Sequence, residues 1–237
     1  MIIWAGTSNK DVGMIIEHYP RVIIPQRSQE VQRVPGRNGA ILLTSGAFEN
    51  YEQQYQAFLD AKYMGGLEAV MPKLVDWLLG HEGYHRLEDS YFPDVYRMAY
   101  YSGGAEFVSI FNEYGEGTLT FNCAPEKYYK SGEREIALEK NQVLRNPTTF
   151  AAFPVLYISG DGSSNGTLTF NDKSVTISAV PVSVTVDVKA HRIYDNTTNY
   201  SNKFTGSYED LKLEKETEIS WSGGIQTVKI VPRWWTI

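Results

Sequence analysis

Short apolar runs separated by turns fill the C-terminal part of this chain, and they restrict it to an antiparallel β architecture. The clearest run is residues 182–188, where four valines alternate with polar residues. This alternation is typical of a strand with one buried and one solvated face. Regular short strands with turn signals between them predict a β-sandwich. The other predicted strands are 153–158, 166–170, 174–179, 208–213, 217–221 and 225–231.

The N-terminal part is organised around residues 31–59. Residues 34–39 form a turn cluster, because Pro fixes φ while Gly and Asn tolerate positive φ. Short strands are predicted on either side of the turn. A second turn leads into 51–59, where tyrosines and other apolar residues fall on one side at period two and Glu and Gln on the other. This pattern predicts a β-meander whose polar edge suits a protein contact better than a reaction.

One helix is expected in the chain. Apolar residues between Leu67 and Leu78 follow helical spacing, but Pro72 lies among them. Because Pro favours the first turn, the predicted helix begins near Pro72 and ends at Leu79, before Gly80. A short buried strand is predicted at 22–24, and the remaining strands at 95–101, 105–111 and 117–123. The expected fold class is mainly β with one short helix in the N-terminal half.

Composition excludes several classes of protein. The net charge of the 237 residues is −6 and no block of Lys or Arg occurs, so specific nucleic-acid binding is not expected. The single cysteine, Cys123, rules out an intrachain disulfide and is expected to be buried. No apolar run approaches the roughly 20 residues of a membrane span, and no signal peptide is evident. Synthesis in a cytoplasm without membrane insertion is expected.

The sharpest enzyme signal is His81–Glu–Gly–Tyr–His85, which matches the H-E-x-x-H zinc motif. That chemistry needs both histidines on one face of a continuous helix, with a third ligand further along. Gly80 and Gly83 disfavour a helix here, and no third histidine follows at a suitable spacing. A solvent-facing turn is the preferred interpretation. No metal, cofactor or catalytic residue is predicted.

Several segments resemble the distal tail protein (Dit) family of long-tailed bacteriophages. The P-G-R-N-G turn precedes a polar and aromatic strand, and a strand at 119–128 is similar to the one that closes the family's N-terminal domain. The segments 154–162, 218–224 and 228–235 follow in the family's order. With Pro147 marking a boundary, the resemblance implies two domains: an N-terminal ring-forming domain (1–145) and a C-terminal galectin-like β-sandwich (146–237).

The resemblance also implies a function. Dit proteins form a hexameric ring that links the tail tube to the tail-associated lysin or fibre hub and the receptor-binding protein. Such a protein would be assembled in the host cytoplasm and located at the tail tip of the virion. Arg33, Arg37, Tyr51 and Tyr55 are residue types enriched at protein interfaces, so they are the predicted ring contact. An ordinary solvated sheet face explains the same residues equally well.

Carbohydrate binding is the alternative function. A galectin-like sandwich could bind host-surface glycans if Trp221, Trp234 or Trp235 were exposed for stacking on sugar rings. However, fold does not determine function. The galectin sugar motif His-x-Asn-x-Arg is not matched by His191 and the residues that follow it. A structural component of a phage tail tip is therefore preferred to a lectin or an enzyme.

Overall fold

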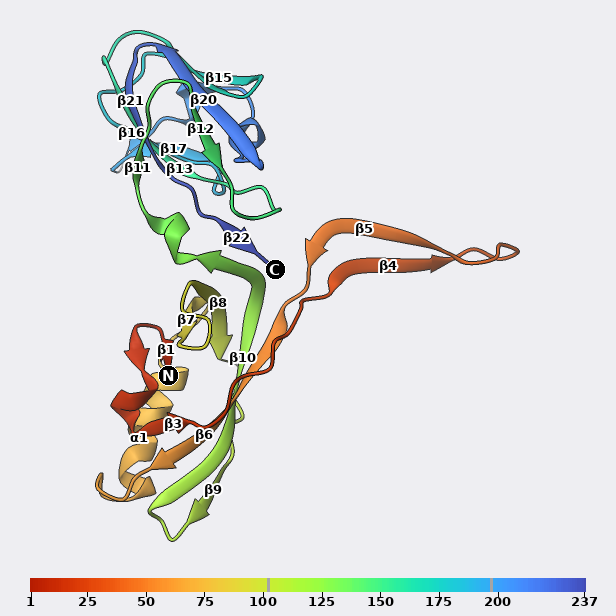
Figure 1. The fold of residues 1–237 in the computed structure, drawn as a ribbon, viewed down its shortest axis with the longest axis vertical. Helices are drawn as coiled ribbons and strands as arrows, with labels where there is room; N and C mark the ends of the chain where they lie inside the picture. The colour runs from red at the N-terminus through yellow and green to blue at the C-terminus, as the bar shows by residue number, and fades with distance from the viewer. Residues whose placement is uncertain (102, 197) are drawn as a thin grey trace. The chain divides into compact units, whose positions relative to one another are not determined.

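The computed structural model describes residues 1–101, 103–196 and 198–237. The described chain is 51% strand and 12% helical, which confirms the mainly β prediction. It divides into two compact units, Met1–Lys127 together with Ile237, and Tyr128–Thr236 (Figure 1). Each unit has its own hydrophobic core.

Unit 1 is built on a large antiparallel sheet with strand order β2-β1-β7-β8-β10-β6-β3, and β9 pairs with the outer part of β10. The helix α1 packs on this sheet through its buried residues. A separate two-stranded sheet consists of β4 and β5. The elements of unit 1 are β1 (Ile2–Trp4), β2 (Thr7–Ser8), β3 (Met14–Ile16), β4 (Arg27–Arg33), β5 (Ala40–Phe48), β6 (Tyr51–Asp60), α1 (Leu67–Leu79), β7 (His85–Asp89), β8 (Val95–Tyr101), β9 (Phe107–Ile110) and β10 (Tyr114–Tyr129), with a 3-10 turn at Asn9–Val12.

The alternation predicted for residues 51–59 is present in β6, but the prediction of a meander is wrong. Strand β6 pairs with β10 and β3, whereas β5 pairs with β4 alone. Alternate residues of β6 are buried from Tyr51 to Leu59, because they face the core of unit 1. The predicted meander is thus two separate features, a core strand and an isolated hairpin.

Helix α1 is longer than predicted. It begins at Leu67, directly after Gly66, and Pro72 lies inside it. Proline provides no N–H to the carbonyl of Glu68, a loss that normally ends or kinks a helix. Here the buried stripe of Leu67, Val70, Leu74, Trp77 and Leu78 stabilises both halves of the helix. The predicted end at Leu79 is confirmed, and no described helix is long and apolar enough to cross a bilayer.

The prediction of a buried strand at 22–24 is wrong. This segment is not a strand, and Val22 and Ile24 are 73% and 78% exposed. Pro20 and Pro25 flank the segment, and each lacks an N–H for a sheet ladder. Only Ile23 packs against the core of unit 1.

Unit 2 is a β-sandwich, as predicted. One sheet has the order β11-β21-β13-β16-β17-β18 and the other β12-β20-β14-β15-β19, and both contribute to one core. The strands are β11 (Ile136–Ala137), β12 (Gln142–Arg145), β13 (Val155–Gly160), β14 (Gly166–Phe170), β15 (Lys173–Ile177), β16 (Val184–Asp187), β17 (Arg192–Asp195), β18 (Thr198–Asn199), β19 (Phe204–Thr205), β20 (Glu216–Gly223), β21 (Ile225–Val231) and β22 (Trp235–Thr236); 3-10 turns lie at Lys130–Glu133, Ser201–Lys203 and Tyr208–Leu211.

Two predictions in this region need correction. The strand expected at 208–213 is largely a 3-10 turn, because the Ser207 hydroxyl accepts a hydrogen bond from the Glu209 N–H at 3.2 Å and caps it. The division between the units lies after Lys127, earlier than the predicted boundary at residues 145 and 146. The reason is that β11 pairs with β21 and β12 with β20, so β11 and β12, within residues 136–145, are part of the sandwich.

Candidate assembly interface

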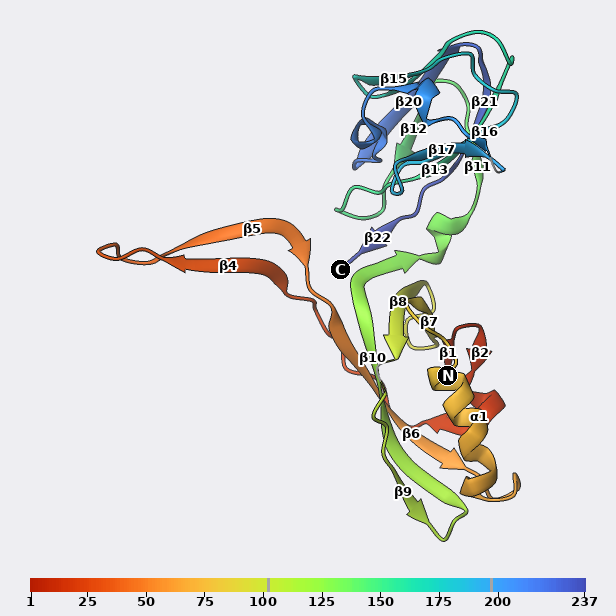
Figure 2. The same ribbon diagram turned by 180° about the vertical axis from the view of Figure 1, so that it is seen from behind.

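The hairpin of β4 and β5, residues 27–48 and here called the arm, lies away from the large sheet of unit 1 (Figures 1 and 2). Its two strands pair only with each other. No residue of the arm is buried. A two-stranded hairpin without a packed face is marginally stable in water. The arm therefore needs contact with a surface outside its own two strands to be stable.

The turn predicted at 34–39 forms the tip of the arm. The Arg37 N–H donates to the Val34 carbonyl at 3.2 Å, and Gly36 and Gly39 both have positive φ. These conformations require glycine, since a Cβ disfavours them. The sequence pattern thus identified the turn correctly, and the strands on either side of it.

The register of the arm decides which side chains share a face. Val31 lies opposite Leu42, and Arg33 lies opposite Ala40 on the same face. On the other face Glu30 is opposite Leu43 and Gln32 opposite Ile41. Val31 and Leu42 are 60% and 59% exposed. Each face of the arm therefore combines uncovered aliphatic groups with polar ones.

Net charge separates the arm from the rest of the protein. The arm contains three arginines and one glutamate, a net of +2. Residues 1–127 contain ten Lys or Arg and sixteen Asp or Glu, a net of −6, so unit 1 without the arm carries −8. The remaining residues contain twelve of each sign and are neutral. A basic arm on an acidic body is electrostatically suited to an acidic partner surface.

The predicted contact residues fall into two groups. Arg33 and Arg37 are exposed on the arm, and neither forms an ion pair within the described part of the chain. Tyr51 and Tyr55 are 7% and 0% exposed in the core of unit 1. The tyrosines therefore cannot contact a neighbouring molecule while this fold is intact, and the prediction for these two residues needs correction.

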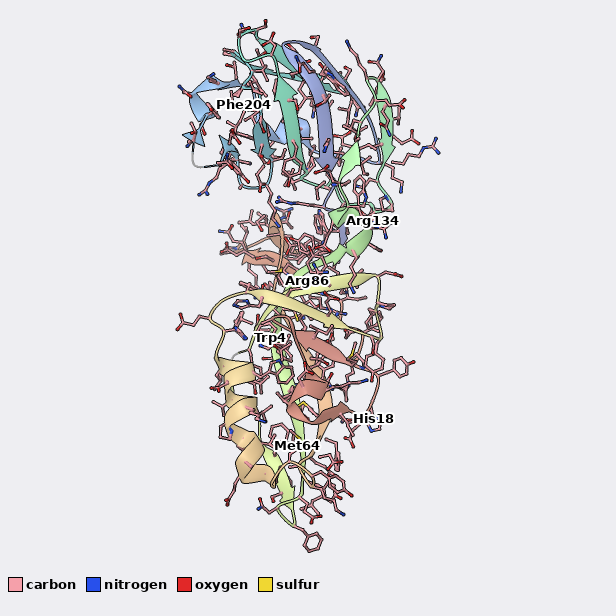
Figure 3. The ribbon with its side chains drawn as sticks, turned by 90° about the vertical axis from the view of Figure 1, so that its left-hand side faces the viewer. Trp4, His18, Met64, Arg86, Arg134 and Phe204 are labelled. Atoms are coloured by element: carbon pink, nitrogen blue, oxygen red, sulfur yellow. The ribbon has the colours of Figure 1, made fainter. Side chains whose placement is uncertain are left out.

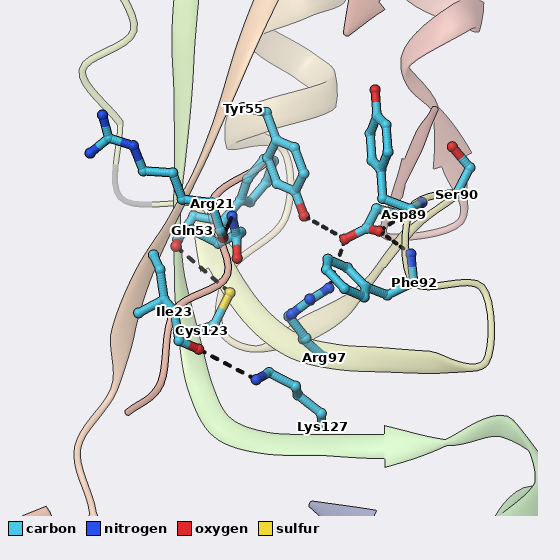
Figure 4. Close-up of polar contacts among 12 residues, drawn as sticks. Arg21, Ile23, Gln53, Tyr55, Asp89, Ser90, Phe92, Arg97, Cys123 and Lys127 are labelled. Carbon is cyan, nitrogen blue, oxygen red and sulfur yellow. Dashed lines mark hydrogen bonds and ion pairs between the residues drawn. The ribbon is translucent and has the colours of Figure 1, made fainter. Parts of the chain in front are cut away.

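Tyr51 and Tyr55 belong to a buried polar network, of which Figure 4 labels Tyr55, Asp89 and Arg97. The Tyr55 hydroxyl donates to Asp89 Oδ2 at 3.0 Å, and Arg97 Nη1 contacts the same oxygen at 2.8 Å. Arg97 Nε donates to the Tyr51 hydroxyl at 3.0 Å. Asp89 Oδ1 accepts from the backbone N–H groups after β7. These contacts join β6, β7 and β8 inside the core, and a buried ion pair with all its partners present stabilises one arrangement of the strands.

Burial also determines the ionisation of this network. It raises the pKa of Tyr51 to about 12 and the pKa of Tyr55 well above its ordinary value. It likewise raises the pKa of the Cys123 thiol to about 12. Cys123 is fully buried, as predicted, and its thiol is inert at neutral pH.

The arm joins the body of unit 1 through the segment before β4. Gln53 Nε2 donates to the Arg21 carbonyl at 3.2 Å, and Lys127 Nζ donates to the Ile23 carbonyl at 3.4 Å (Figure 4). The Glu49 N–H donates to the Gln26 carbonyl at 2.8 Å where the two strands leave the body. These side chains hold an irregular segment against β6 and β10.

The H-E-x-x-H motif does not form a zinc site. α1 ends at Leu79 and His85 begins β7, so no helix carries the two histidines. No group of three potential ligands gathers among the described residues. The turn is also less solvent-facing than predicted, because both histidines are half-buried. Their ring centroids lie 6.5 and 5.7 Å from that of Trp4, which is fully buried in unit 1 (Figure 3).

The tryptophans considered for sugar stacking are packing residues. Trp221 and Trp234 are 8% and 6% exposed in the core of unit 2. Trp235 is half-buried, stacks on Phe150 at 4.6 Å and donates from Nε1 to the Ala151 carbonyl at 2.9 Å. None of the three presents an open aromatic face of the kind that sugar binding requires.

Comparison with solved structures identifies the fold. The crystal structure of the Dit protein of phage SPP1 aligns with a TM-score of 0.72 over 97% of this chain and 96% of that one, at 14% identity. The chain has the Dit fold. The baseplate of phage p2 in its activated conformation gives a TM-score of 0.49 at 11% identity, over 92% and 90% of the two chains. No family model matches the sequence, and no curated protein matches it.

Proposed function

We propose that this Dit-like chain is a structural component of the tail tip of a long-tailed phage. The likeness to SPP1 Dit, which is described as a hub of the adsorption apparatus in phages that infect Gram-positive bacteria, supports this role. In this proposal six copies form a ring through unit 1. The ring joins the tail tube to the tail-associated lysin or fibre hub and to the receptor-binding protein, with assembly in the host cytoplasm.

The observation that carries the proposal is the uncovered arm. Val31, Leu42 and Leu43 expose aliphatic groups on a hairpin with no core of its own. A second copy of the chain can cover them, and Arg33 and Arg37 can then pair with its acidic surface. A contact in which an arm meets a different patch on the next copy is heterologous, and heterologous contacts form a ring when the rotation between copies closes. The proposed role is structural, without catalysis or a cofactor.

Light scattering of the purified chain tests the ring. A hexamer of the 26.8 kDa chain has a mass of roughly 161 kDa. The double variant Val31→Ser/Leu42→Ser should reduce the mass to that of a monomer, because it removes the apolar pair from the arm. Val182→Ser, at an exposed valine of unit 2, is the matched control and should leave the mass unchanged. A wild-type chain that stays monomeric at about 100 µM would contradict ring formation by the chain itself.

A further inference from the structure

An apolar groove with a volume of about 120 Å³ lies between α1 and the segment that leads into β9. Its helical wall consists of Met71, Val75 and Leu79, spaced four residues apart, and these side chains are 37%, 46% and 55% exposed. The opposite wall includes Ala105 and Phe107 at the start of β9. A continuous apolar groove on a surface helix is a feature of interaction sites rather than of ordinary solvated surface.

Three exposed acidic residues lie close in sequence to the side chains that line the groove. Glu68 and Asp76 are exposed on α1, and Glu106 is exposed between the two residues of the opposite wall. Lys73 is the one basic residue on the helix. The groove is thus lined by apolar side chains, and exposed acidic residues neighbour its lining along the chain, a combination that suits an apolar ligand with basic flanks.

The arm has the complementary chemistry. On one face the apolar pair Val31 and Leu42 lies next to Arg33, which is two residues along β4. The aliphatic pair matches the apolar lining of the groove, and the arginine matches the acidic residues that neighbour this lining along the chain. Apart from its arm, unit 1 carries a net charge of −8 against +2 on the arm, so the two surfaces attract each other.

We propose that the Val31–Leu42 face of the arm of one copy docks into the α1–Phe107 groove of the next copy. This inference rests on the proposed ring and names the surface that receives the arm. Arm and groove are different patches of unit 1, so the contact is heterologous and can repeat from copy to copy until the ring closes. It covers two of the apolar surfaces that the described part of a single chain leaves in water.

Cross-linking between two populations of the protein tests the contact. Leu42→Cys is placed in one population and Val75→Cys in the other, and the mixture is oxidised mildly at about 100 µM. Burial prevents the native Cys123 from reacting. A disulfide-linked dimer should form in the mixture. Replacing Val75→Cys by Lys73→Cys, on the same helix but outside the groove, should yield about tenfold less of it.

Self-association of charge variants tests the same contact without relying on the geometry of an introduced cysteine. Val75→Glu should weaken self-association at least about tenfold, because it puts a charge into the apolar lining. Ala69→Glu adds the same charge to an exposed position of α1 outside the groove and should change association little. Circular dichroism of both variants checks that the fold is retained.

The outcomes separate the two proposals. Preferential cross-linking at Val75 with loss of association in Val75→Glu supports the groove. A wild-type chain that associates, while cross-linking equals the Lys73 control and Val75→Glu associates normally, overturns the groove and leaves the ring intact. A wild-type chain that neither associates nor cross-links overturns the ring, and the groove with it.

Discussion

The arm and the β14–β15 hairpin of unit 2 have the same local design with opposite surroundings. In each, an antiparallel pair of strands places a leucine directly opposite a valine, Leu42 and Val31 in the arm and Leu168 and Val175 in unit 2. The first pair is 59% and 60% exposed, and the second is 0% and 1% exposed. Strand pairing alone therefore does not determine whether an apolar pair is covered.

The difference indicates where each hairpin gets its stability. β14 pairs with β20 on its other side and contributes to the core of unit 2, so its apolar pair stabilises the fold of a single chain. The arm has no third strand and no core. Its apolar residues contribute little to the folding of one chain and are available for assembly.

The largest expected effect is the difference in stability lost when a carboxylate is removed from the body of unit 1 and from the arm. Asp89→Ala removes the carboxylate that pairs with Arg97 in the core, and we expect it to cost about 3–5 kcal/mol, because a buried charge then lacks its partner. Glu30→Ala, the matched change on the exposed arm, should alter stability by no more than about 0.5 kcal/mol. Urea unfolding of both variants measures this. Equal losses would show that the arm is part of the folded core.

The two hairpins are compared directly by the same substitution. Leu168→Ala should destabilise the protein by about 2–5 kcal/mol, because it opens a cavity in unit 2. Leu42→Ala removes the same atoms from a solvated site and should cost less than about 0.5 kcal/mol in the monomer. The measurement is urea unfolding at a dilution where the chain is monomeric. A loss at Leu42 comparable to that at Leu168 would mean that the arm is covered within its own chain.

The local pattern of the sequence predicts much of the fold, but it does not always predict which face of a strand is buried. Period two in residues 51–59 identified β6 correctly. The sequence predicts an outer contact for the tyrosines because tyrosine is a residue type enriched at protein interfaces. Their partners, Asp89 and Arg97, lie 34 and 46 residues away from Tyr55 and Tyr51. Such a pairing depends on tertiary structure, and no local window of the sequence contains it.

Two other differences have the same origin. The helix was shortened at Pro72, whereas tertiary burial of its apolar stripe stabilises it from Leu67 onward. The boundary was placed after a polar stretch, although β12 pairs with β20 about 70 residues later. One feature of the candidate site was available from the sequence and was missed. The arm is basic while the rest of residues 1–127 is acidic, and counting charge by segment identifies it.

Alkaline pH should destabilise the body of unit 1 through its buried tyrosines. Burial raises the pKa of Tyr51 to about 12, so the unfolded chain ionises first as pH rises above about 10. The contribution of Tyr51 is fully present below pH 10 and is lost as pH rises towards 12, roughly 3 kcal/mol in all. Tyr55 acts in the same direction. Urea unfolding between pH 8 and pH 11 follows the loss.

The variant Tyr51→Phe tests whether Tyr51 causes the loss of stability at alkaline pH. It should reduce the decline of stability above pH 10, because it removes one of the two phenols of the buried network whose pKa values are raised. Tyr63→Phe is the matched control, since Tyr63 is 89% exposed and should not affect the decline. An unchanged decline in Tyr51→Phe would show that the core network does not govern alkaline unfolding.

The smallest expected effect concerns the arginines of the arm. Arg33→Gln and Arg37→Gln remove charges that the single chain leaves without an ion pair, so the stability of the monomer should not change. Self-association should weaken a few-fold per arginine, since ion pairs at the rim of an interface contribute about 0.2–1 kcal/mol each. The effect should also shrink as salt rises, because the Debye length falls from about 10 Å at 0.1 M to about 3 Å at 1 M. Arg192→Gln, at an exposed site of unit 2, is the control. If the arm variants and this control associate equally at low salt, the arm meets its neighbour through apolar contacts alone, and its basic charge has no part in assembly.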